Sequence, residues 1–390
     1  MDENTLTQTS ALIIGAGPVG ALLALALNRL GWQVTLVEQH DFSQGLPASY
    51  DNRQLALTAG SIDWLKQTQL LPLLMAELTP ILSIHSSSQN NLGTLSMTHS
   101  EMDVAALGYT LSQERLGRCL FAMLKQTTVQ LVDAIQPQEL TQTSTTVSLT
   151  TLDKQQQLQT WHADYLFAAD GAHSWTRQQL NIKIQTRHYP HQLLTAIATL
   201  SEAHNNLAIE RFTAQGPTAL LPMANEHQAK VVYCYPVEKA EMVKQLSTKS
   251  LIDTINYQLG RTLGKVITLE AIVHYPLVEI RADSIQQERC LLVGNAAHTQ
   301  HPVAGQGLNL GIRDIQAVYQ WAQDCQAGGW QALAKQRQGD HQHTMNFTHG
   351  LVTLFGHPSP LVRRAASAGM GLLTLCRPLK NRITRMAMGY

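Results

Sequence analysis

A glycine-rich turn near the start of the chain limits the fold more than any other feature. Residues Gly15-Ala16-Gly17-Pro18-Val19-Gly20 match the pattern G-x-G-x-x-G, directly after an apolar run and at the start of a helical pattern. Such a turn presents bare backbone N–H groups and a helix dipole to a pyrophosphate. Glu38 follows at the end of the next predicted strand, where it can accept hydrogen bonds from ribose hydroxyls. The alternative is a tight turn that only packs a helix on a strand; the glycines, the helix and Glu38 together disfavour it.

Periodicity along the chain predicts a βαβ unit around this turn. We expect a strand, a helix and a second strand over residues 11–15, 18–30 and 33–38. Two later apolar runs, 163–169 and 290–294, also end in glycine-bearing turns. Residues of roughly 186–279 alternate in strand fashion with Pro and Gly breaks, and the chain after Ala304 is largely helical in pattern.

Composition limits the partners and metals that the chain can use. The 28 basic and 28 acidic residues cancel, so no global field would recruit nucleic acid. The five cysteines lie far apart without a Cys-x-x-Cys pair, and the sixteen histidines show no metal-binding spacing. We therefore expect no metal, and a reducing compartment.

The start of the chain carries no secretory signal pattern. Its first ten residues are polar, and the apolar run that follows contains the glycine turn. The sequence contains no stretch of about 18 uninterrupted apolar residues, so it predicts no transmembrane helix. We expect a cytoplasmic protein, with at most peripheral contact with the inner face of the cytoplasmic membrane.

Two further motifs follow the first in a characteristic order. Residues 170–177 have the pattern D-G-x-x-S-x-x-R, from Asp170-Gly171 to Arg177. Gly294-Asn295-Ala296-Ala297-His298 opens a long glycine-rich loop. With these three motifs in order, nearly the whole chain resembles the single-component FAD-dependent aromatic hydroxylases. The resemblance implies FAD as cofactor, NAD(P)H as electron donor and O2 as co-substrate.

The resemblance also implies an architecture. It indicates an α/β fold in which a three-layer, Rossmann-like FAD-binding domain carries an inserted, mostly β substrate domain and a helical C-terminus. We expect the FAD-binding domain to comprise residues 1–75, 99–185 and 280–330. The substrate domain would comprise residues 76–98 and 186–279, and the helical C-terminal region residues 331–390.

Roles for individual residues follow from the matched motifs. By resemblance, the second motif serves both the FAD pyrophosphate and the path of NAD(P)H; the alternative for Asp170 and Arg177 is a simple turn and a solvated arginine. The third motif would lie against the flavin ring, with the Pro302 carbonyl close to its oxygen-reacting face. The residues expected near the chemistry are Pro302, Gly305, Gln306 and Gly307. The residues expected to bind the cofactor are Gly15, Gly17, Gly20, Glu38, Arg53, Gln113, Arg118, Asp170, Gly171, Arg177, Gly294, Asn295, Gly305, Gly307 and Asn309.

The third motif departs from the family's usual pattern at one position. Asn295 stands where the family usually has an aspartate that accepts a hydrogen bond from the ribityl chain, so the acceptor here has no charge.

Arg53 precedes a predicted helix that begins at Gln54, and Gln113 to Arg118 precede an amphipathic helix around Leu120–Leu124. Both stretches resemble FAD-contacting segments of the family, in which Arg53 would neutralise phosphate.

Further segments resemble one subgroup of the family, the hydroxylases of ubiquinone biosynthesis. They are Ala105–Gly108, Glu210–Thr213, Gly216–Met223 and the Asn-containing third motif. This implies a polyprenylated methoxyphenol as substrate, and other ubiquinone-biosynthesis proteins as partners. Hydroxylation at another ring carbon and a small soluble phenol stay open. So does a different class, an FAD-binding subunit with weak activity that scaffolds an enzyme assembly.

The C-terminal tail has an asymmetric charge. After Asp340 the sequence has no Asp or Glu, but it has six basic residues among many Leu, Ile and Met. They are Arg363, Arg364, Arg377, Lys380, Arg382 and Arg385. A basic amphipathic pattern suits an anionic membrane surface, and the alternative is a helix docked on the catalytic domain with a solvated basic face.

Overall fold

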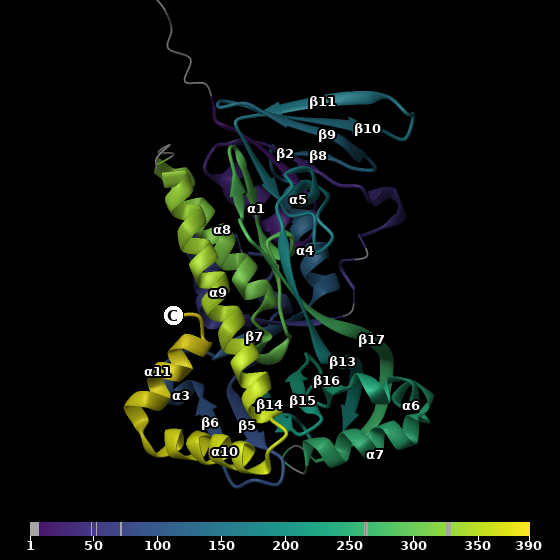
Figure 1. Cartoon of the computed structure of the whole chain (residues 1–390), viewed down its shortest axis with the longest axis vertical. Coiled ribbons are helices and arrows are strands. Elements are labelled where there is room, and N and C mark those ends of the chain that lie inside the picture. Colours follow the sequence, from purple (N-terminus) through teal and green to yellow (C-terminus); the bar gives the residue numbers. More distant parts are fainter. Residues whose placement is uncertain are drawn as a thin grey trace, which may run out of the picture.

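The computed structural model describes residues 8–47, 49–51, 53–70, 72–260, 262, 264–324 and 329–390. Its upper half in Figure 1 is built around a six-stranded sheet with the order β18-β19-β12-β1-β2-β8. The strands β1, β2, β8, β12 and β19 are parallel to one another, and the edge strand β18 pairs antiparallel with β19. Their bounds are β1 Ser10–Ile14, β2 Gln33–Val37, β8 Gln130–Val132, β12 Tyr165–Ala168, β18 Gln286–Gln287 and β19 Cys290–Leu292.

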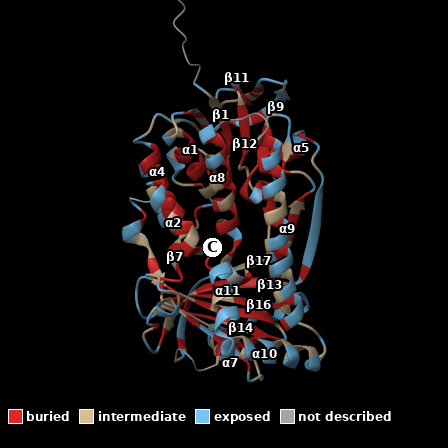
Figure 2. Ribbon diagram, turned by 90° about the vertical axis from the view of Figure 1, so that its left-hand side faces the viewer, coloured by how far each residue is buried: buried red, intermediate tan, exposed pale blue. Residues whose placement is uncertain are grey.

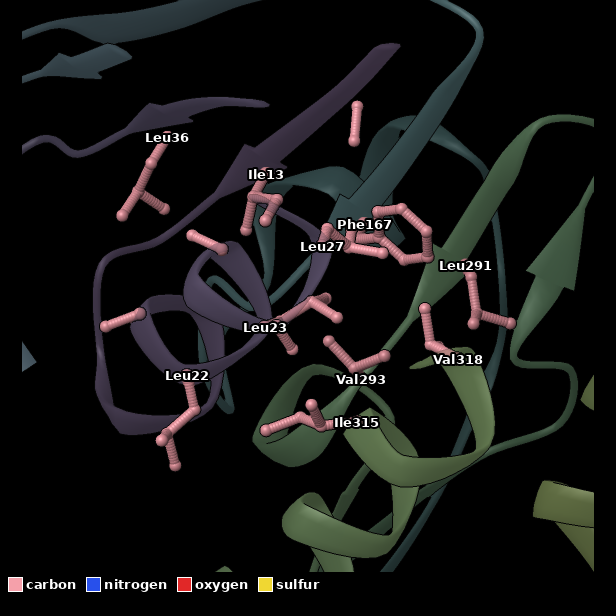
Figure 3. Close-up of a cluster of buried hydrophobic side chains, with 14 of the residues drawn as sticks. Ile13, Leu22, Leu23, Leu27, Leu36, Phe167, Leu291, Val293, Ile315 and Val318 are labelled. Carbon is pink, nitrogen blue, oxygen red and sulfur yellow. The ribbon is translucent and has the colours of Figure 1, made fainter. Parts of the chain in front are cut away.

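This sheet lies between helices and a second sheet. Helices α1 (Pro18–Arg29) and α8 (Gly307–Asp324) pack on it through buried Leu, Ile and Val side chains, as Figure 3 shows for Leu23, Val293 and Ile315. Strands β9 (Gln136–Gln142), β10 (Val147–Leu152) and β11 (Leu158–Ala163) form an antiparallel sheet, and Val147 and Leu149 of β10 are buried in the same core. The α/β class and the three layers of the Rossmann-like domain are therefore confirmed.

The lower half of Figure 1 contains an eight-stranded sheet with the order β20-β17-β13-β16-β15-β14-β5-β6. Helix α7 (Thr248–Leu259) and helix α6 (Ala240–Gln245) cover one of its faces over a separate apolar core. The long strands β13 (Ile184–Leu200) and β17 (Val266–Ala282) run from one half of the molecule to the other (Figure 1). The other strands are β5 Ser83–Ser88, β6 Thr94–Thr98, β14 Leu207–Thr213, β15 Gly216–Pro222, β16 Gln228–Pro236 and β20 His298–Thr299.

A three-stranded sheet and several helices join the two halves. The small sheet has the order β3-β7-β4, with β3 Gln54–Thr58, β4 Thr79–Ile81 and β7 Gly108–Ser112. The remaining helices are α2 Ala59–Gln67, α3 His99–Met102, α4 Gln113–Leu124, α5 Trp175–Gln179, α9 Gly329–Phe355, α10 Pro360–Leu375 and α11 Arg377–Ala387. Helix α9 runs along the side of both halves, and α10 and α11 turn back beneath it (Figure 1).

Three local expectations were wrong. The segment from Gln54 is a strand, because Leu55 and Leu57 alternate and the backbone pairs with β7; the helix begins only at Ala59, after the N-cap Thr58. Helix α4 begins at Gln113, since the Ser112 hydroxyl caps it. The glycine-rich loop of the third motif, which we expected to extend through Gly307, Asn309 and Gly311, ends at Gln306, so that these three residues belong to α8.

The C-terminal helices are docked on the rest of the chain. The N–H of Gly60 donates to the carbonyl of Met388 over 2.8 Å, and the Ser367 hydroxyl accepts from the N–H of Gly93 over 3.0 Å. Lys380 is 8% exposed and donates to both oxygens of Glu101 at 2.8 and 2.9 Å. Figure 2 shows the mixture of buried and exposed residues on α10 and α11. Among the described helices, none combines the length and the apolar character needed to cross a membrane.

Candidate active site

A cavity of about 590 Å³ lies between the two halves of the molecule. One wall carries residues of all three glycine motifs, among them Gly17, Gly171, Asn295 and Gly307. The opposite wall is one face of the eight-stranded sheet. The predicted cofactor site and the predicted substrate domain therefore share one continuous space.

The three glycines of the first motif have different surroundings. Gly15 has φ +99°, and a Cβ there would lie 2.6 Å from the carbonyl oxygen of Ala169. A Cβ on Gly20 would lie 1.9 Å from the carbonyl oxygen of Gly15. By contrast, the closest atom to a Cβ on Gly17 is the Ser49 Oγ at 3.9 Å, on the cavity side. Gly15 and Gly20 are thus required by the protein's own packing, whereas Gly17 leaves room for a ligand.

Glu38 and Tyr50 fix the turn between these glycines. The carboxylate of Glu38 accepts hydrogen bonds from the N–H groups of Ala16 at 2.7 Å and of His40 at 3.0 Å. The Tyr50 hydroxyl donates to the Ala16 carbonyl over 2.9 Å. Burial, with the nearby charge of Glu38, raises the pKa of Tyr50 well above its usual value, so it remains a donor.

One part of the second motif faces the cavity, and the other part is a buried arginine that connects two loops by hydrogen bonds. Gly171 has φ +84° and lines the cavity, and apart from its chain neighbours no atom of the described residues lies within 4 Å of the place that a Cβ would occupy. One carboxylate oxygen of Asp170 accepts from the N–H of Thr176 at 2.9 Å, and the other is buried without a partner among the described residues. Arg177 is 4% exposed and donates to the carbonyls of Ala172 and Ala296, each at 2.8 Å. It therefore ties the second motif to the third.

The third motif presents Asn295 to the cavity from a tightly held backbone. Asn295 is exposed and lines the cavity, between the buried Gly294 and Ala296. The N–H of Gly294 donates to Asp314 on α8 over 3.0 Å. The Gly294 backbone has φ +56°, a conformation that suits glycine. Asn295 is thus held where its side chain can reach a ligand.

Asp314 is the centre of a buried charge cluster behind this loop. Its oxygens contact His298 at 3.2 Å, His341 at 2.6 Å and Arg337 at 2.9 Å. Burial alone would raise the pKa of Asp314, but His341, Arg337 and the hydrogen bonds from both histidines hold it well below the usual value. Burial and the nearby His341 lower the pKa of His298 to about 4.

Three members of this cluster, His298, Asp314 and His341, could in principle bind a metal, since their ligand atoms lie within 4.8 Å of one another. The oxygen of Asp314 that contacts His341 also accepts from the Arg337 guanidinium. A cation thus already neutralises the carboxylate. The geometry supports a hydrogen-bonded cluster that holds the third motif in place.

The loop that follows is held by Asn309. The Asn309 Oδ1 accepts from the Thr58 N–H at 2.8 Å and the Ser61 hydroxyl at 2.9 Å, while its Nδ2 donates to the carbonyls of Ala56 and Gly305, both at 2.8 Å. Asn309 is 1% exposed, so its amide is shielded from solvent. It joins the loop to β3 and α2 and does not line the cavity.

The residues expected near the chemistry surround the end of this loop. Pro302, Gly305 and Gly307 line the cavity, and Gln306 is buried. The Pro302 carbonyl accepts from the Gly305 N–H at 3.0 Å, which closes a turn. Gly307 begins α8, and apart from its chain neighbours and the backbone of its own helix no atom of the described residues lies within 4 Å of a Cβ position there. A helix N-terminus with bare backbone thus faces the cavity.

The structure brings two of the three remaining predicted residues to the cavity. Arg53 lines it and pairs with Asp51 at 2.8 Å. Gln113 is buried at the start of α4, lines the cavity and donates to the Ser49 carbonyl. Arg118 points elsewhere: its side chain is 68% exposed and pairs with Glu114.

The opposite wall is mostly apolar because alternate residues of each strand share a face. On β16 these are Lys230, Val232 and Cys234, and neighbouring strands add Leu193, Thr195, Ala208, Pro217, Ala219 and Leu221. Glu210 and Lys230 are the charged groups on this wall among the described residues. Burial lowers the pKa of Lys230.

These features fit FAD. Gly17, Gly171 and Gly307 expose bare backbone to one cavity, where side chains would fill the space needed by a dinucleotide. The exposed amide of Asn295 lines this cavity, and Asp170, which precedes the cavity-lining Gly171, has one carboxylate oxygen without a partner among the described residues. Residues 8–322 match the FAD binding domain family. The chain belongs to the FAD binding domain family. Its cofactor is therefore FAD.

Relatives of this FAD binding domain protein include named ubiquinone hydroxylases. It is 29% identical to the ubiquinone hydroxylase UbiL of Rhodospirillum rubrum, over 97% of this chain and 89% of that protein. It is 28% identical to the ubiquinone hydroxylase UbiM of Neisseria meningitidis, over 97% and 84%. It is 27% identical to the 3-demethoxyubiquinol 3-hydroxylase of Escherichia coli, over 80% and 78%.

Solved structures share the fold. The p-nitrophenol 4-monooxygenase PnpA of Pseudomonas putida superposes with a TM-score of 0.81 over 98% of both chains, at 16% identity. PqsL of Pseudomonas aeruginosa, solved in complex with 2-aminobenzoylacetate, gives a TM-score of 0.77 over 93% of this chain and 99% of its own, at 20% identity.

Sequence reasoning missed several residues that position the FAD site. Tyr50 lies in an irregular loop and Asp314 within an ordinary amphipathic helix, so neither carries a local pattern. His341 and Arg337 lie on α9, far from the motifs in sequence. Only their contacts in the folded chain identify them.

Proposed function

We propose that this protein is an FAD-dependent monooxygenase that hydroxylates the aromatic ring of a polyprenylated methoxyphenol in ubiquinone biosynthesis, using NAD(P)H and O2. The reaction is of the 2-octaprenyl-6-methoxyphenol hydroxylase type. The observation that carries the proposal is the continuous cavity, which joins the glycine cradle for FAD to an apolar sheet face. Such a wall suits an aromatic ring with an isoprenoid chain. The ubiquinone hydroxylases among the relatives support the same substrate class.

The residues of the chain prepare this chemistry by position. Bound FAD would supply the redox chemistry, with NAD(P)H as the reductant and O2 as the oxidant. The N-terminus of α8 at Gly307 places backbone N–H groups where they stabilise negative charge. Asn309 and Arg177 hold the surrounding loops, and the apolar side chains of the sheet face exclude water.

Two alternative functions remain distinct from this proposal. One is a hydroxylase of the same pathway that acts at another ring carbon, and the other is an FAD-binding scaffold subunit with weak activity. Asn295 in place of the family's usual aspartate is the observation that favours the scaffold. We favour the enzyme, because the cavity beyond Asn295 is open to a substrate-sized molecule.

Substrate-stimulated oxidation of NAD(P)H tests the proposal directly. The FAD-loaded protein is mixed with NADH or NADPH, with and without a prenylated methoxyphenol, and the hydroxylated product is identified by mass spectrometry. We expect faster NAD(P)H oxidation with the phenol and incorporation of one oxygen atom. No stimulation by any prenylated phenol would favour the scaffold, and a product hydroxylated at another carbon would select the other enzyme.

We also propose peripheral contact with the inner face of an anionic membrane through α10 and α11. Leu361, Leu372, Leu375 and Met386 are 61–81% exposed, and Arg364, Arg377, Arg382 and Arg385 are exposed on the same two helices. Lys380 does not belong to this surface, since it is buried and paired with Glu101. The tail is therefore both a docked element and a basic, apolar surface suited to anionic lipid.

A further inference from the structure

Buried polar atoms without partners are concentrated where the loop of the third motif meets the substrate wall. Both amide atoms of Gln300, the Nε2 of His301 and the hydroxyl of Thr195 are buried, and none has a hydrogen-bond partner among the described residues. All three side chains line the cavity. Buried polar atoms are normally paired, because leaving one unpaired costs about 1–3 kcal/mol. Four such atoms, on three side chains that line one cavity, indicate that a ligand supplies the partners.

The state of His301 is set by its own neighbours. Its Nδ1 accepts a hydrogen bond from the Val303 N–H over 3.2 Å, so in the neutral ring the proton is on Nε2. Burial, with the nearby His191 and His349, lowers the pKa of His301 to about 3. His301 is 1% exposed and its ring packs edge-on against Tyr189, at 4.9 Å between centroids. It therefore offers a fixed, neutral N–H donor to the cavity.

The position of these groups suits the polar side of an aromatic ring that also carries a hydrocarbon chain. Gln300 and His301 directly precede Pro302, and Thr195 lies on β13, on the same face as Leu193. Beyond them the wall is dominated by apolar side chains such as Ala219, Leu221 and Val232. A phenol that buries its oxygens at the polar groups must extend its hydrocarbon chain along the apolar face.

We propose that Gln300, His301 and Thr195 form a subsite that binds the phenolic oxygens of the substrate and so fixes which ring carbon is hydroxylated. The amide of Gln300 both donates and accepts, the His301 Nε2–H donates, and the Thr195 hydroxyl does either. A hydroxyl beside a methoxy group presents one donor and two acceptors to this set. The inference rests on the proposed function, and it names the residues that recognise the ring.

Ligand binding to the oxidised FAD-loaded protein tests the subsite without turnover. The probes are 2-methoxy-6-prenylphenol with one isoprene unit and the same compound without its hydroxyl, titrated through the change in flavin absorbance. We expect the parent protein to prefer the phenol by about tenfold or more, since a site built for a hydroxyl rejects its analogue. Gln300→Met and His301→Phe should each lower that preference at least severalfold, and His301→Gln, which keeps an N–H near the Nε2 position, should restore part of it.

Thr195 has a matched control in the same sheet. Thr218 on β15 is also buried with an unpartnered hydroxyl, but it does not line the cavity. Thr195→Val should reduce the preference for the phenol, and Thr218→Val should leave it unchanged. Because these are near-isosteric changes, they test the subsite even if His301→Phe impairs folding.

Two outcomes would overturn the inference. If the variants bind phenol and deoxy analogue with the parent's preference, the three side chains do not recognise the oxygens. If they instead lose FAD or shift the flavin absorbance before any ligand is added, the groups serve the cofactor. Failure of the proposed function is distinguishable, because the parent protein itself would then bind neither probe and show no stimulated NAD(P)H oxidation.

Discussion

The carboxylate of Asp314 accepts a hydrogen bond from the backbone N–H of Gly294 over 3.0 Å, and so connects the buried charge cluster to the loop that carries Asn295. The same carboxylate contacts Arg337 on α9 at 2.9 Å. Helices α8 and α9 thereby hold one edge of the FAD site from behind the loop. The position of Asn295 depends on charges that lie behind it.

Replacing Asp314 should therefore weaken both the fold and FAD binding. Asp314→Asn breaks the buried ion pair with Arg337 and leaves Asp340 as the carboxylate beside that guanidinium. Breaking a buried ion pair is strongly destabilising, by up to about 3–5 kcal/mol. We expect a lower free energy of unfolding in urea and a higher dissociation constant for FAD. Asp283→Asn, at an exposed position, is the control and should change stability by no more than about 0.5 kcal/mol. An unchanged urea midpoint for Asp314→Asn would contradict the role of the cluster.

Gly17 and Gly15 should respond differently to the same substitution. A valine at Gly17 projects into open cavity, so Gly17→Val should fold normally and lose FAD. A valine at Gly15 meets the Ala169 carbonyl and a positive φ, so Gly15→Val should lower the melting temperature of the FAD-free protein as well. Flavin absorbance and circular dichroism measure the two effects. Stoichiometric FAD in Gly17→Val would show that the cofactor does not approach this turn.

Asn295→Asp should bind FAD at least as tightly as the parent. The side chain is exposed to the cavity, so a carboxylate there keeps access to solvent before the cofactor binds. A charged acceptor strengthens a hydrogen bond by roughly 1 kcal/mol, about a fivefold change in the dissociation constant. Equilibrium titration with FAD measures it, with Asn295→Ala as the comparison. A large loss of affinity in Asn295→Asp would show that the NH2 group of Asn295 is the part in contact.

The docking of α11 should depend on pH through Glu101. The hydrogen bond from Lys380 lowers the pKa of Glu101 below its usual value of 4.5. A carboxyl whose pKa is lower in the folded state stabilises that state above the unfolded pKa, and the contribution is lost as pH falls through the folded pKa. We expect amide hydrogen exchange in α11, corrected for intrinsic rates, to accelerate below about pH 4.5. Glu101→Gln should lack this acid-dependent step; if it keeps the step, another group is responsible.

The exposed arginines of α11 should determine binding to anionic vesicles. Arg377, Arg382 and Arg385 each contribute about 1 kcal/mol near an anionic surface, so replacing all three with Gln should weaken binding about a hundredfold. Co-sedimentation with phosphatidylglycerol vesicles measures this, and FAD content should not change.

A matched triple variant provides the control for the vesicle experiment. Lys125, Lys249 and Lys335 are also exposed but lie outside α10 and α11, so their replacement by Gln should leave vesicle binding almost unchanged. Equal binding by the parent and the arginine variant would show that the basic face is only solvated.

The sequence determined those parts of the protein whose chemistry is local. Gly15 and Gly20 are fixed by a turn whose close backbone contacts leave no room for a side chain, and this turn, with a strand before it and Glu38 after it, predicted a Rossmann-like dinucleotide-binding domain. The order of the three motifs predicted the family. Each of these signals depends on residues that are neighbours along the chain.

Tertiary structure decided what depends on distant contacts. Arg118 was assigned to the cofactor from its motif, but it points into solvent; Lys380 was assigned to the basic surface, but it is buried against Glu101. Asn309 matched a cofactor motif, and in the folded chain its buried side chain joins the loop to β3 and α2 through four hydrogen bonds. A side chain's partner depends on which face its element buries, and that face is set only when the elements pack together. The local sequence pattern therefore specified the glycine turns of the FAD site, and packing specified which side chains reach the cavity.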